Sequence, residues 1–350
     1  MQVAAGRHLL DRTLALAGTG VTLSGAGAEL SILSFKGHAQ AQGVRVQGSG
    51  VTVANLAIED SGAAALTIRG SQVVVRGVRA SWSGGPQARN GAYGIHVQGA
   101  HDVLIEDSAA YSASGAGIYV QESRSVIVRR CHAEQNVAGI ALTDVVDADV
   151  SDSLATGNST GIVVATLSPQ PSHAVRLFAN KIQQNNLGNF AAAGTPLARL
   201  PSGAGILLNA ARDVEVFDND VSGNQTANLL IAADFFATDH GTAQHALLPG
   251  AIFVYGNRFS GGGNAPFSAP LKAVLLAKFA AAGHLPDILW DGFAVPADGG
   301  SPPGRICIKN DKATVLNADA PHGYRNPDDS LAPFDCTLPK LPPVALAAGG

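Results

Sequence analysis

A short motif recurs along the chain at nearly constant spacing. The stretches GAYGIHVQG, SGAGIYVQE and NVAGIALTD begin at residues 91, 114 and 136, and share Gly-Ile followed by alternating residues. The residue after the glycine, or its equivalent, falls at Leu66, Ile95, Ile118, Ile140, Ile162, Ile206 and Leu229, mostly 22 or 23 residues apart. The longer interval across 163–205 fits two turns or one turn with a long loop. We favour the loop, because residues 186–205 show no strand pattern.

Each repeat also contains a second segment in which apolar residues alternate with others. VTVANLAI, VVVRGVRA, VIVRRCHA and VEVFDNDV are examples, and a period of two indicates strands with one buried face. So short a repeat leaves no room for a crossover helix, and its strands must stack on those of the next repeat. The sequence therefore predicts an all-β, single-stranded parallel β-helix, a solenoid of roughly nine or ten rungs at roughly 4.8 Å spacing. General rules for parallel crossovers make it right-handed.

Alignment of these second segments places small polar residues in two columns. One column begins with Leu56 and Val78 and continues with Ser108, Cys131, Ser153, Asn180, Asn219 and Asn257, and the other contains Asn136, Asn158, Asn185 and Asn224. Stacked asparagines can donate and accept amide hydrogen bonds from rung to rung, which satisfies buried polar atoms. We interpret both columns as structural. The same position makes Cys131 a small buried residue and not a catalytic thiol.

The composition limits the classes of protein to which the chain can belong. Of its 350 residues 46% are hydrophobic, and the formal net charge of −4 offers no basic surface for nucleic acid. No apolar run approaches the roughly 20 residues of a membrane-spanning helix. Cys307 and Cys336 lie close together in a proline-rich segment, which indicates a disulfide and an oxidising compartment, with two reduced buried cysteines as the alternative. We interpret MQVAAGRHLL as a start Met fused to a trimmed mature chain.

Several phrases of the sequence resemble a known family, the secreted right-handed parallel β-helix repeat proteins. More narrowly, they resemble a bacterial group often encoded beside, or fused with, a c-type-cytochrome-like protein. The phrases are WSGGPQARNGAYGI (82–95), ASGAGIYV (113–120), AEQNVAGI (133–140), NLGNFA (186–191), LPDILWDG (285–292), CIKN (307–310) and PFDCTLPKLPPV (333–344). The resemblance implies export to the periplasm or beyond, and a tail closed by a disulfide. It brings no established activity.

The two ends of the chain depart from the repeat. Residues 1–263 are expected to form the solenoid, and 264–350 a C-terminal capping segment that is not a separate domain. In that segment APLKAVLLAKFAAAG predicts a helix at about 269–283, since its apolar residues have helical spacing. A terminal rung exposes an open sheet edge, and we expect the helix to cover it.

The residues between the inward Ile and Val of the motif should point outward, into solvent, along one parallel sheet. Polar side chains concentrate there in the rungs of His96, Tyr119 and Thr143, and the later rungs turn apolar. Wider resemblance to β-helix polysaccharide lyases and epimerases favours a carbohydrate-active enzyme that acts on a uronate. Such an enzyme needs a base, an acid and a cation for the sugar carboxylate. We assign the base and the acid to His96 and Tyr119, and the cation to Arg69 or Arg89.

Neighbouring side chains complete the expected site. Candidates for substrate binding are Arg89, Asn90, Tyr93, Gln98, Gln121, Thr143 and Asp144. Asp239, His240 and His245 are weak candidates for a metal site, since their spacing matches no closed motif. No cofactor is required by the sequence, although calcium is possible.

Two functions from different classes stay open. The first is an exported polysaccharide lyase or C5-epimerase. The second is a non-catalytic binding or scaffold module associated with a cytochrome-like redox partner, whose haem would belong to the partner because no Cys-x-x-Cys-His motif is present. The apolar outward positions Val163, Leu207 and Leu230 would then dock that partner or the chain's own loops. A crowded polar cleft at His96 and Tyr119 would favour the enzyme.

Overall fold

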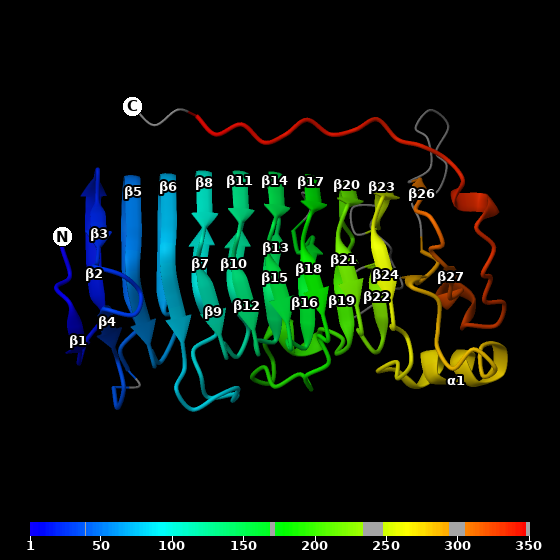
Figure 1. The fold of residues 1–350 in the computed structure, drawn as a ribbon, viewed down its shortest axis with the longest axis horizontal. Coiled ribbons are helices and arrows are strands. Elements are labelled where there is room, and N and C mark those ends of the chain that lie inside the picture. The colour runs from blue at the N-terminus through cyan, green and yellow to red at the C-terminus, as the bar shows by residue number, and fades with distance from the viewer. Residues whose placement is uncertain (39, 169–171, 234–247, 294–304, 348–350) are drawn as a thin grey trace.

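The repeats fold into three parallel β-sheets that wind around one apolar core (Figure 1). The computed structural model describes residues 1–38, 40–168, 172–233, 248–293 and 305–347. Each turn as far as β24 contributes one strand to each sheet, and each strand pairs with its equivalent in the next turn; within these ranges the last turns add strands only to the first and second sheets. The predicted β-helix is confirmed.

The first sheet carries the Gly-Ile motif. Its strands are β2 (Leu14–Thr19), the first parts of β5 (Val44–Glu59) and β6 (Leu66–Ser81), β7 (Tyr93–Gln98), β10 (Ala116–Gln121), β13 (Ala138–Thr143), β16 (Thr160–Ala165), β19 (Ala204–Asn209), β22 (Ala227–Ala232), β25 (Ile288–Trp290) and β27 (Val315–Asn317).

The second and third sheets follow it in every turn. The second contains β3 (Thr22–Ser24), the middle parts of β5 and β6, β8 (His101–Glu106), β11 (Arg124–Arg129), β14 (Val146–Ser151), β17 (His173–Phe178), β20 (Arg212–Phe217), β23 (Gly250–Tyr255) and β26 (Ile306–Lys309). The third contains β1 (Gly6–Leu9), β4 (Ser31–Ser34), the last parts of β5 and β6, β9 (Ala109–Tyr111), β12 (His132–Glu134), β15 (Leu154–Thr156), β18 (Lys181–Gln183), β21 (Asp220–Ser222) and β24 (Arg258–Ser260).

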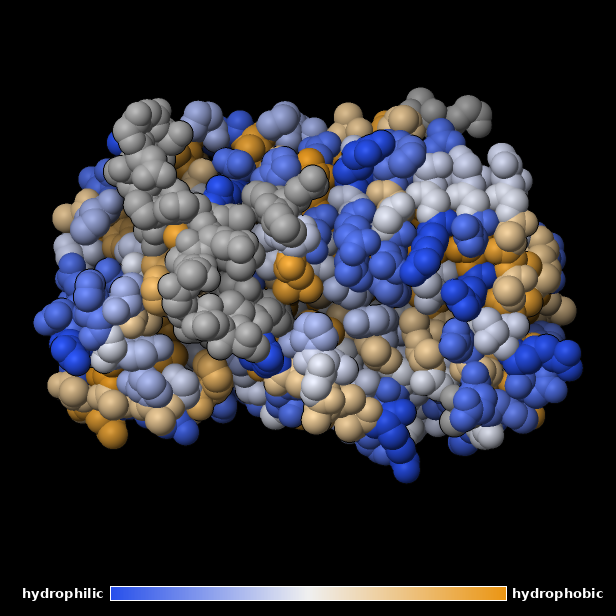
Figure 2. All heavy atoms as spheres, turned by 180° about the vertical axis from the view of Figure 1, so that it is seen from behind, coloured by the Kyte–Doolittle hydropathy of each residue, from blue (hydrophilic) through white to orange (hydrophobic). Residues whose placement is uncertain are grey.

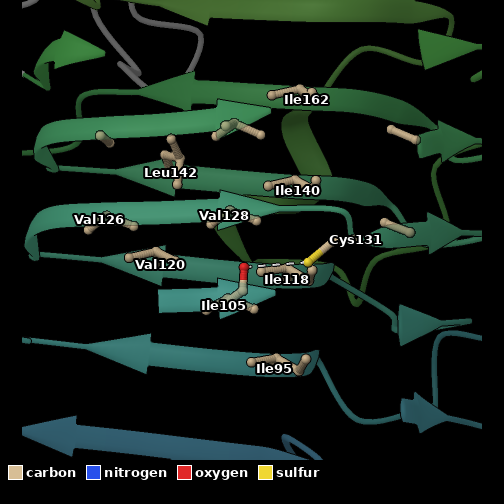
Figure 3. Close-up of a cluster of buried hydrophobic side chains, with 14 of the residues drawn as sticks. Ile95, Ile105, Ile118, Val120, Val126, Val128, Cys131, Ile140, Leu142 and Ile162 are labelled. Carbon is tan, nitrogen blue, oxygen red and sulfur yellow. Dashed lines mark hydrogen bonds between the residues drawn. The ribbon is translucent and has the colours of Figure 1, made fainter. Parts of the chain in front are cut away.

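The core is built from the same motif position in every rung. Ile95, Ile118, Ile140 and Ile162 stand opposite one another in the strand register and are fully buried (Figure 3). Because side chains alternate along a strand, this register sends every second residue of the sheet inward. The interval across 163–205 is a single turn, since Val163 pairs directly with Leu207.

The asparagine columns explain why glycine precedes the isoleucine. The Nδ2 atom of Asn158 donates to Oδ1 of Asn185 at 2.9 Å, and Oδ1 of Asn158 accepts from the backbone of Asn136 at 2.9 Å. A Cβ atom at Gly161 would lie 2.4 Å from a carbonyl oxygen of the next rung and 2.8 Å from Nδ2 of Asn185. Only glycine leaves room for the column at this point. Both columns are confirmed as structural.

Cys131 belongs to the other column. Its backbone N–H donates to the Ser153 hydroxyl at 3.1 Å, and its Sγ contacts the Ile105 carbonyl at 3.7 Å (Figure 3). Burial raises the pKa of the thiol to about 12, so it is not ionised at neutral pH.

The C-terminal segment continues the stack and also covers one side of it. Strands β25, β26 and β27 add to the sheets after residue 263, so no break in strand pairing marks that position. Helix α1 (Ala269–Lys278) starts where expected, and the Ser268 side chain caps it by accepting the Leu271 N–H. It ends at Lys278, before the expected position 283. Its buried residues Leu271 and Val274 pack on the outward face of the first sheet, and not on the terminal edge as we expected. Short 3₁₀ turns occur at Pro196–Arg199, Ala320–His322 and Ala332–Phe334.

The last described residues return along the solenoid toward its N-terminal end (Figure 1). A disulfide between Cys307 and Cys336 fixes the start of this tail, as predicted. Tail N–H groups then donate to carboxylates on every second turn of the second sheet, on β20, β14 and β8. The bonds are Leu341 to Glu215 at 3.1 Å, Val344 to Asp149 at 3.3 Å and Ala347 to Asp102 at 2.9 Å. The tail therefore forms a strap across many rungs, where the sequence predicted only a cap.

Candidate functional site

Most outward residues of the first sheet are buried, although the alternation of the sequence is kept. Ala141 and Leu207 are 0% exposed, Val163 1% and Leu230 3%. They form a second apolar cluster with Leu197 and Leu200 of the 186–203 segment and with Leu271 and Val274 of α1. The prediction that this face looks into solvent is wrong, because a loop and a helix from later in the chain cover it. The apolar positions dock the chain's own segments, one of the two outcomes we expected for them.

Three rings meet where the outward face becomes polar. Strand β7 supplies Tyr93 and His96, and β10 supplies Tyr119. Tyr93 lies 4.7 Å from both other rings, centroid to centroid, and the His96 and Tyr119 rings are stacked at 5.1 Å. His96 stands directly opposite Tyr119 in the register, so the one-rung offset expected from the repeat produces this contact. We call Tyr93, His96 and Tyr119 the aromatic cluster.

The His96 imidazole is held in its neutral form. The residue is 9% exposed, and its Nε2 atom has no hydrogen-bond partner within the described part of the chain. Burial lowers its pKa to about 4, and the charge of Arg69 acts in the same direction. The Gln121 side chain opposes this shift without offsetting it. At neutral pH the ring can therefore accept a proton.

Tyr119 is held as a phenol in the same environment. It is 5% exposed, and its hydroxyl forms a hydrogen bond of 2.8 Å with the Thr143 hydroxyl on the next rung. Burial raises the pKa of Tyr119 well above its usual value, so the phenol keeps its proton at neutral pH. A neutral imidazole and a protonated phenol thus face each other, as a base and an acid would.

A strip of polar side chains extends from this cluster toward the surface. Arg69 donates to Oε1 of Gln98 at 2.6 Å, and Gln98 lies 3.5 Å from Oε2 of Glu122. Gln121 donates to the other oxygen of Glu122 at 3.2 Å. These are exposed contacts, so their polar groups remain available to a ligand. We call Arg69, Gln98, Gln121 and Glu122 the polar strip.

A groove of about 350 Å³ lies beside the strip, where the first sheet turns into the second. It is lined by Gly99, Ala100, His101, Glu122, Ser123, Arg124, Asp144, Val146 and Ser168. Asp144 also accepts the N–H groups of Leu167 and Ser168, at 2.8 and 3.0 Å, and so fixes the next turn. The sequence reading missed His101 and Arg124, because they begin the second-sheet strands and the outward pattern of the first sheet ends before them.

Arg89 and Asn90 lie in a different place from the other predicted residues. Asn90 donates to the carbonyls of Gly85 and Ser112 at 2.7 Å each, and so closes its own loop and ties it to the next turn. Arg89 lines a separate groove of about 500 Å³ together with Trp82 and other residues. The insertion before β7 thus does not bring a guanidinium to the aromatic cluster, and Arg69 is the arginine whose charge acts on His96.

The predicted metal candidates Asp239, His240 and His245 fall outside the described residues. In the ranges that the structure describes, no three His, Cys, Asp or Glu side chains converge as metal ligands would. Nor does any described helix have the length and apolar character needed to cross a membrane. The possible dependence on calcium stays a prediction.

Comparison with known proteins agrees with this architecture. Residues 19–174 match the family described as "Right handed beta helix region". The periplasmic alginate epimerase AlgG is similar in structure, with a TM-score of 0.54 and 11% identity over 89% of this chain and 75% of that chain. The enzymatically active domain of tailspike protein 2 of bacteriophage CBA120 has a TM-score of 0.51 and 9% identity, over 93% of this chain and 49% of its own. A search of curated proteins gives no match. At such identities the likeness concerns the fold alone, and the chain has the fold of a right-handed parallel β-helix.

Proposed function

We propose that this protein is an exported, carbohydrate-active β-helix protein whose substrate is a uronate-containing polysaccharide. The observation that carries the proposal is the stacked pair of a neutral His96 and a protonated Tyr119, with the charge of Arg69 close enough to act on His96. These are the three chemical groups that removal of the proton beside a sugar carboxylate requires.

In the proposed reaction, Arg69 binds the substrate carboxylate and stabilises the charge that develops on it. His96 Nε2 is buried in the free protein; in this proposal substrate binding uncovers it, and it then accepts the proton from the carbon beside that carboxylate. Tyr119 donates its phenolic proton to the leaving glycosidic oxygen in a lyase. An epimerase would need another group to supply a proton on the opposite face of the carbon, because His96 and Tyr119 are stacked side by side on one sheet. A bound carboxylate next to His96 also raises the pKa of the imidazole from about 4, which makes it a stronger base when substrate is present.

Two further observations support the proposal. The structurally similar AlgG is an alginate epimerase of the periplasm, and alginate is a polymer of uronates. The disulfide between Cys307 and Cys336 fits an oxidising compartment, as export requires.

Formation of unsaturated uronate, followed by its absorbance, tests the lyase reaction. Alginate, pectate and glycosaminoglycans are the substrates, each with and without added calcium. We expect absorbance to appear with the wild-type protein and to fall by at least about 100-fold in rate in His96→Ala and Tyr119→Phe. The matched controls are His132→Ala and Tyr111→Phe, which remove the same groups from the third sheet, where Tyr111 and His132 contact each other.

Incorporation of solvent deuterium beside the carboxylate, observed by NMR, tests the epimerase reaction on the same substrates. If neither signal appears while glycan binding is lost in Arg69→Ala, the cluster is a carbohydrate-binding site without chemistry. If no glycan binds at all, the proposal is refuted.

The redox-partner alternative receives no specific observation from the structure. Its expected apolar docking positions are covered by the chain itself. Figure 2 shows the face opposite to that of Figure 1, and hydrophilic residues are spread over the half that holds the N-terminal rungs. Co-purification with a cytochrome-like protein remains the experiment for that prediction.

A further inference from the structure

A second cavity lies on the outward face of the first sheet, several rungs beyond the aromatic cluster. Its volume is about 460 Å³, in the range of sites that enclose a small molecule. Leu230 of β22 and Leu289 of β25 form its floor, and Leu271 of α1 contributes to one wall. The other lining residues are Ala233, Phe267, Ser268, Asp291, Phe293, Ala318, Ala320 and Tyr324. We call it the Asp291 pocket.

The lining is apolar except for very few groups. The Ser268 hydroxyl accepts the Leu271 N–H at the start of α1, so it is used by the fold. Tyr324 and Asp291 are the titratable residues among the described lining residues. An apolar cavity with one or two polar groups converging on it is the usual form of a small-molecule site, because burial gives affinity and the polar groups fix orientation.

Asp291 reaches the cavity because it continues the outward column of the first sheet. It follows β25 directly, and its N–H donates to the Ile231 carbonyl at 3.1 Å, which extends the pairing of β25 with β22. Its carboxylate oxygens accept N–H groups of Ala233 at 2.6 Å and of Phe293 at 2.9 Å. Each oxygen has a further lone pair beyond these bonds.

The carboxylate lacks a counter-charge in the described structure. No ion pair with Lys, Arg or His is formed by Asp291 in the described ranges, whereas Asp149 and Glu106 each bind arginine. Burial raises its pKa to about 7, against the two backbone hydrogen bonds. An ionised carboxylate in an apolar cavity is costly unless a cation pairs with it.

We propose that the Asp291 pocket binds an apolar molecule carrying a single ammonium group, with the ammonium on the Asp291 carboxylate and the apolar body between α1 and the first sheet. The apolar walls accept the body, and the carboxylate, which has no cationic partner among the described residues, selects the charge. The site is independent of the aromatic cluster and of any reaction there.

Three probes with one apolar body and different head groups test this site by titration calorimetry. They are 4-phenylbutylamine, 4-phenylbutanol and 4-phenylbutyrate. We expect the amine to bind about tenfold more tightly than the alcohol, and the carboxylate probe to bind most weakly. The amine affinity should also rise by about 30-fold from about pH 5.5 to about pH 8, as Asp291 loses its proton.

Two variants locate the binding. Asp291→Asn should remove the preference for the amine and keep the alcohol affinity. Ala320→Trp should fill the cavity and abolish binding of every probe, while Leu276→Trp adds the same indole to the solvent side of α1, where Leu276 is 72% exposed, and should change nothing. If Asp291→Asn does not fold, the pH dependence of the amine affinity of the wild-type protein tests the role of Asp291 in its place. Equal affinity for the three probes, an amine affinity that does not depend on pH, or no binding of the amine would overturn the proposal. Asp291 would then serve only to hold the two backbone segments whose N–H groups it accepts.

Discussion

The asparagine column gives a prediction whose size follows from individual hydrogen bonds. Asn158 is fully buried, and its Oδ1 accepts from the backbone N–H and from Nδ2 of Asn136, at 2.9 and 3.0 Å. Its Nδ2 donates to the Ala133 carbonyl at 3.0 Å and to Oδ1 of Asn185 at 2.9 Å. Asn158→Ala removes all four bonds in one step.

Most of the lost stability comes from neighbouring polar groups that stay buried after the substitution without a hydrogen-bond partner. The backbone N–H of Asn136 loses its acceptor, and an unsatisfied buried donor costs about 1–3 kcal/mol. The other lost bonds contribute about 1 kcal/mol each at most, since Asn136 Nδ2 keeps its bonds to Ala110 and Glu134. We expect Asn158→Ala to lower the free energy of unfolding by about 3–5 kcal/mol.

Asn310→Ala is the matched control at the end of the other column. Asn310 accepts the Asn257 N–H and donates to the Asn257 carbonyl, but it is only partly buried, so water can replace it. We expect a loss of about 1 kcal/mol or less. Urea denaturation followed by circular dichroism measures both, with an unchanged m value as the sign that only stability has changed. Equal losses in the two variants, or a loss below about 1 kcal/mol in Asn158→Ala, would refute the idea that the columns satisfy buried groups.

Three further predictions concern the close rung contact, the tail and pH. Gly161→Ala should lower the free energy of unfolding by about 1–3 kcal/mol, because the new Cβ clashes with the next rung. Gly188→Ala is the control, since its Cβ would meet no atom within 4 Å, and it should leave stability unchanged. Thermal melts compare the two variants. Truncation after Cys336 removes the tail N–H groups that bind the buried carboxylates of Glu215 and Asp149. The free energy of unfolding, measured in urea, should fall by about 2 kcal/mol, and no fall would mean that the tail is only loosely attached. The folded protein holds His96 neutral, with a pKa of about 4, while the unfolded value is about 6.5. Relative to His96→Gln, the wild-type protein should therefore keep its stability above about pH 6.5 and lose about 3 kcal/mol by about pH 4, as denaturation at several pH values would show; a constant difference would contradict the burial of His96.

The fold was accessible from the sequence because its information is local and repeated. Spacing of 22 or 23 residues places Ile118 between Ile95 and Ile140, and the structure has this register. The same alignment brings His96 opposite Tyr119 and stacks Asn158 on Asn185.

Part of the candidate site was accessible for the same reason, and part was not. Tyr93 joined His96 and Tyr119 as expected, while Arg89, in an insertion outside the period, went to another groove. Asp291 was missed, although LPDILWDG adds one more rung to the outward column of the first sheet. Its strand is only three residues long and follows a helix, so the repeat gave no register for it.

The sequence by itself determined which way each side chain of a rung points, because alternation along a strand and the repeat length are local properties. Only the tertiary structure decided what lies over the outward side chains. The 186–203 segment and α1 cover the first sheet, and the tail covers the second. These contacts join residues far apart in the chain, outside the period, and they set the burial that makes His96 neutral and leaves Asp291 in an apolar cavity.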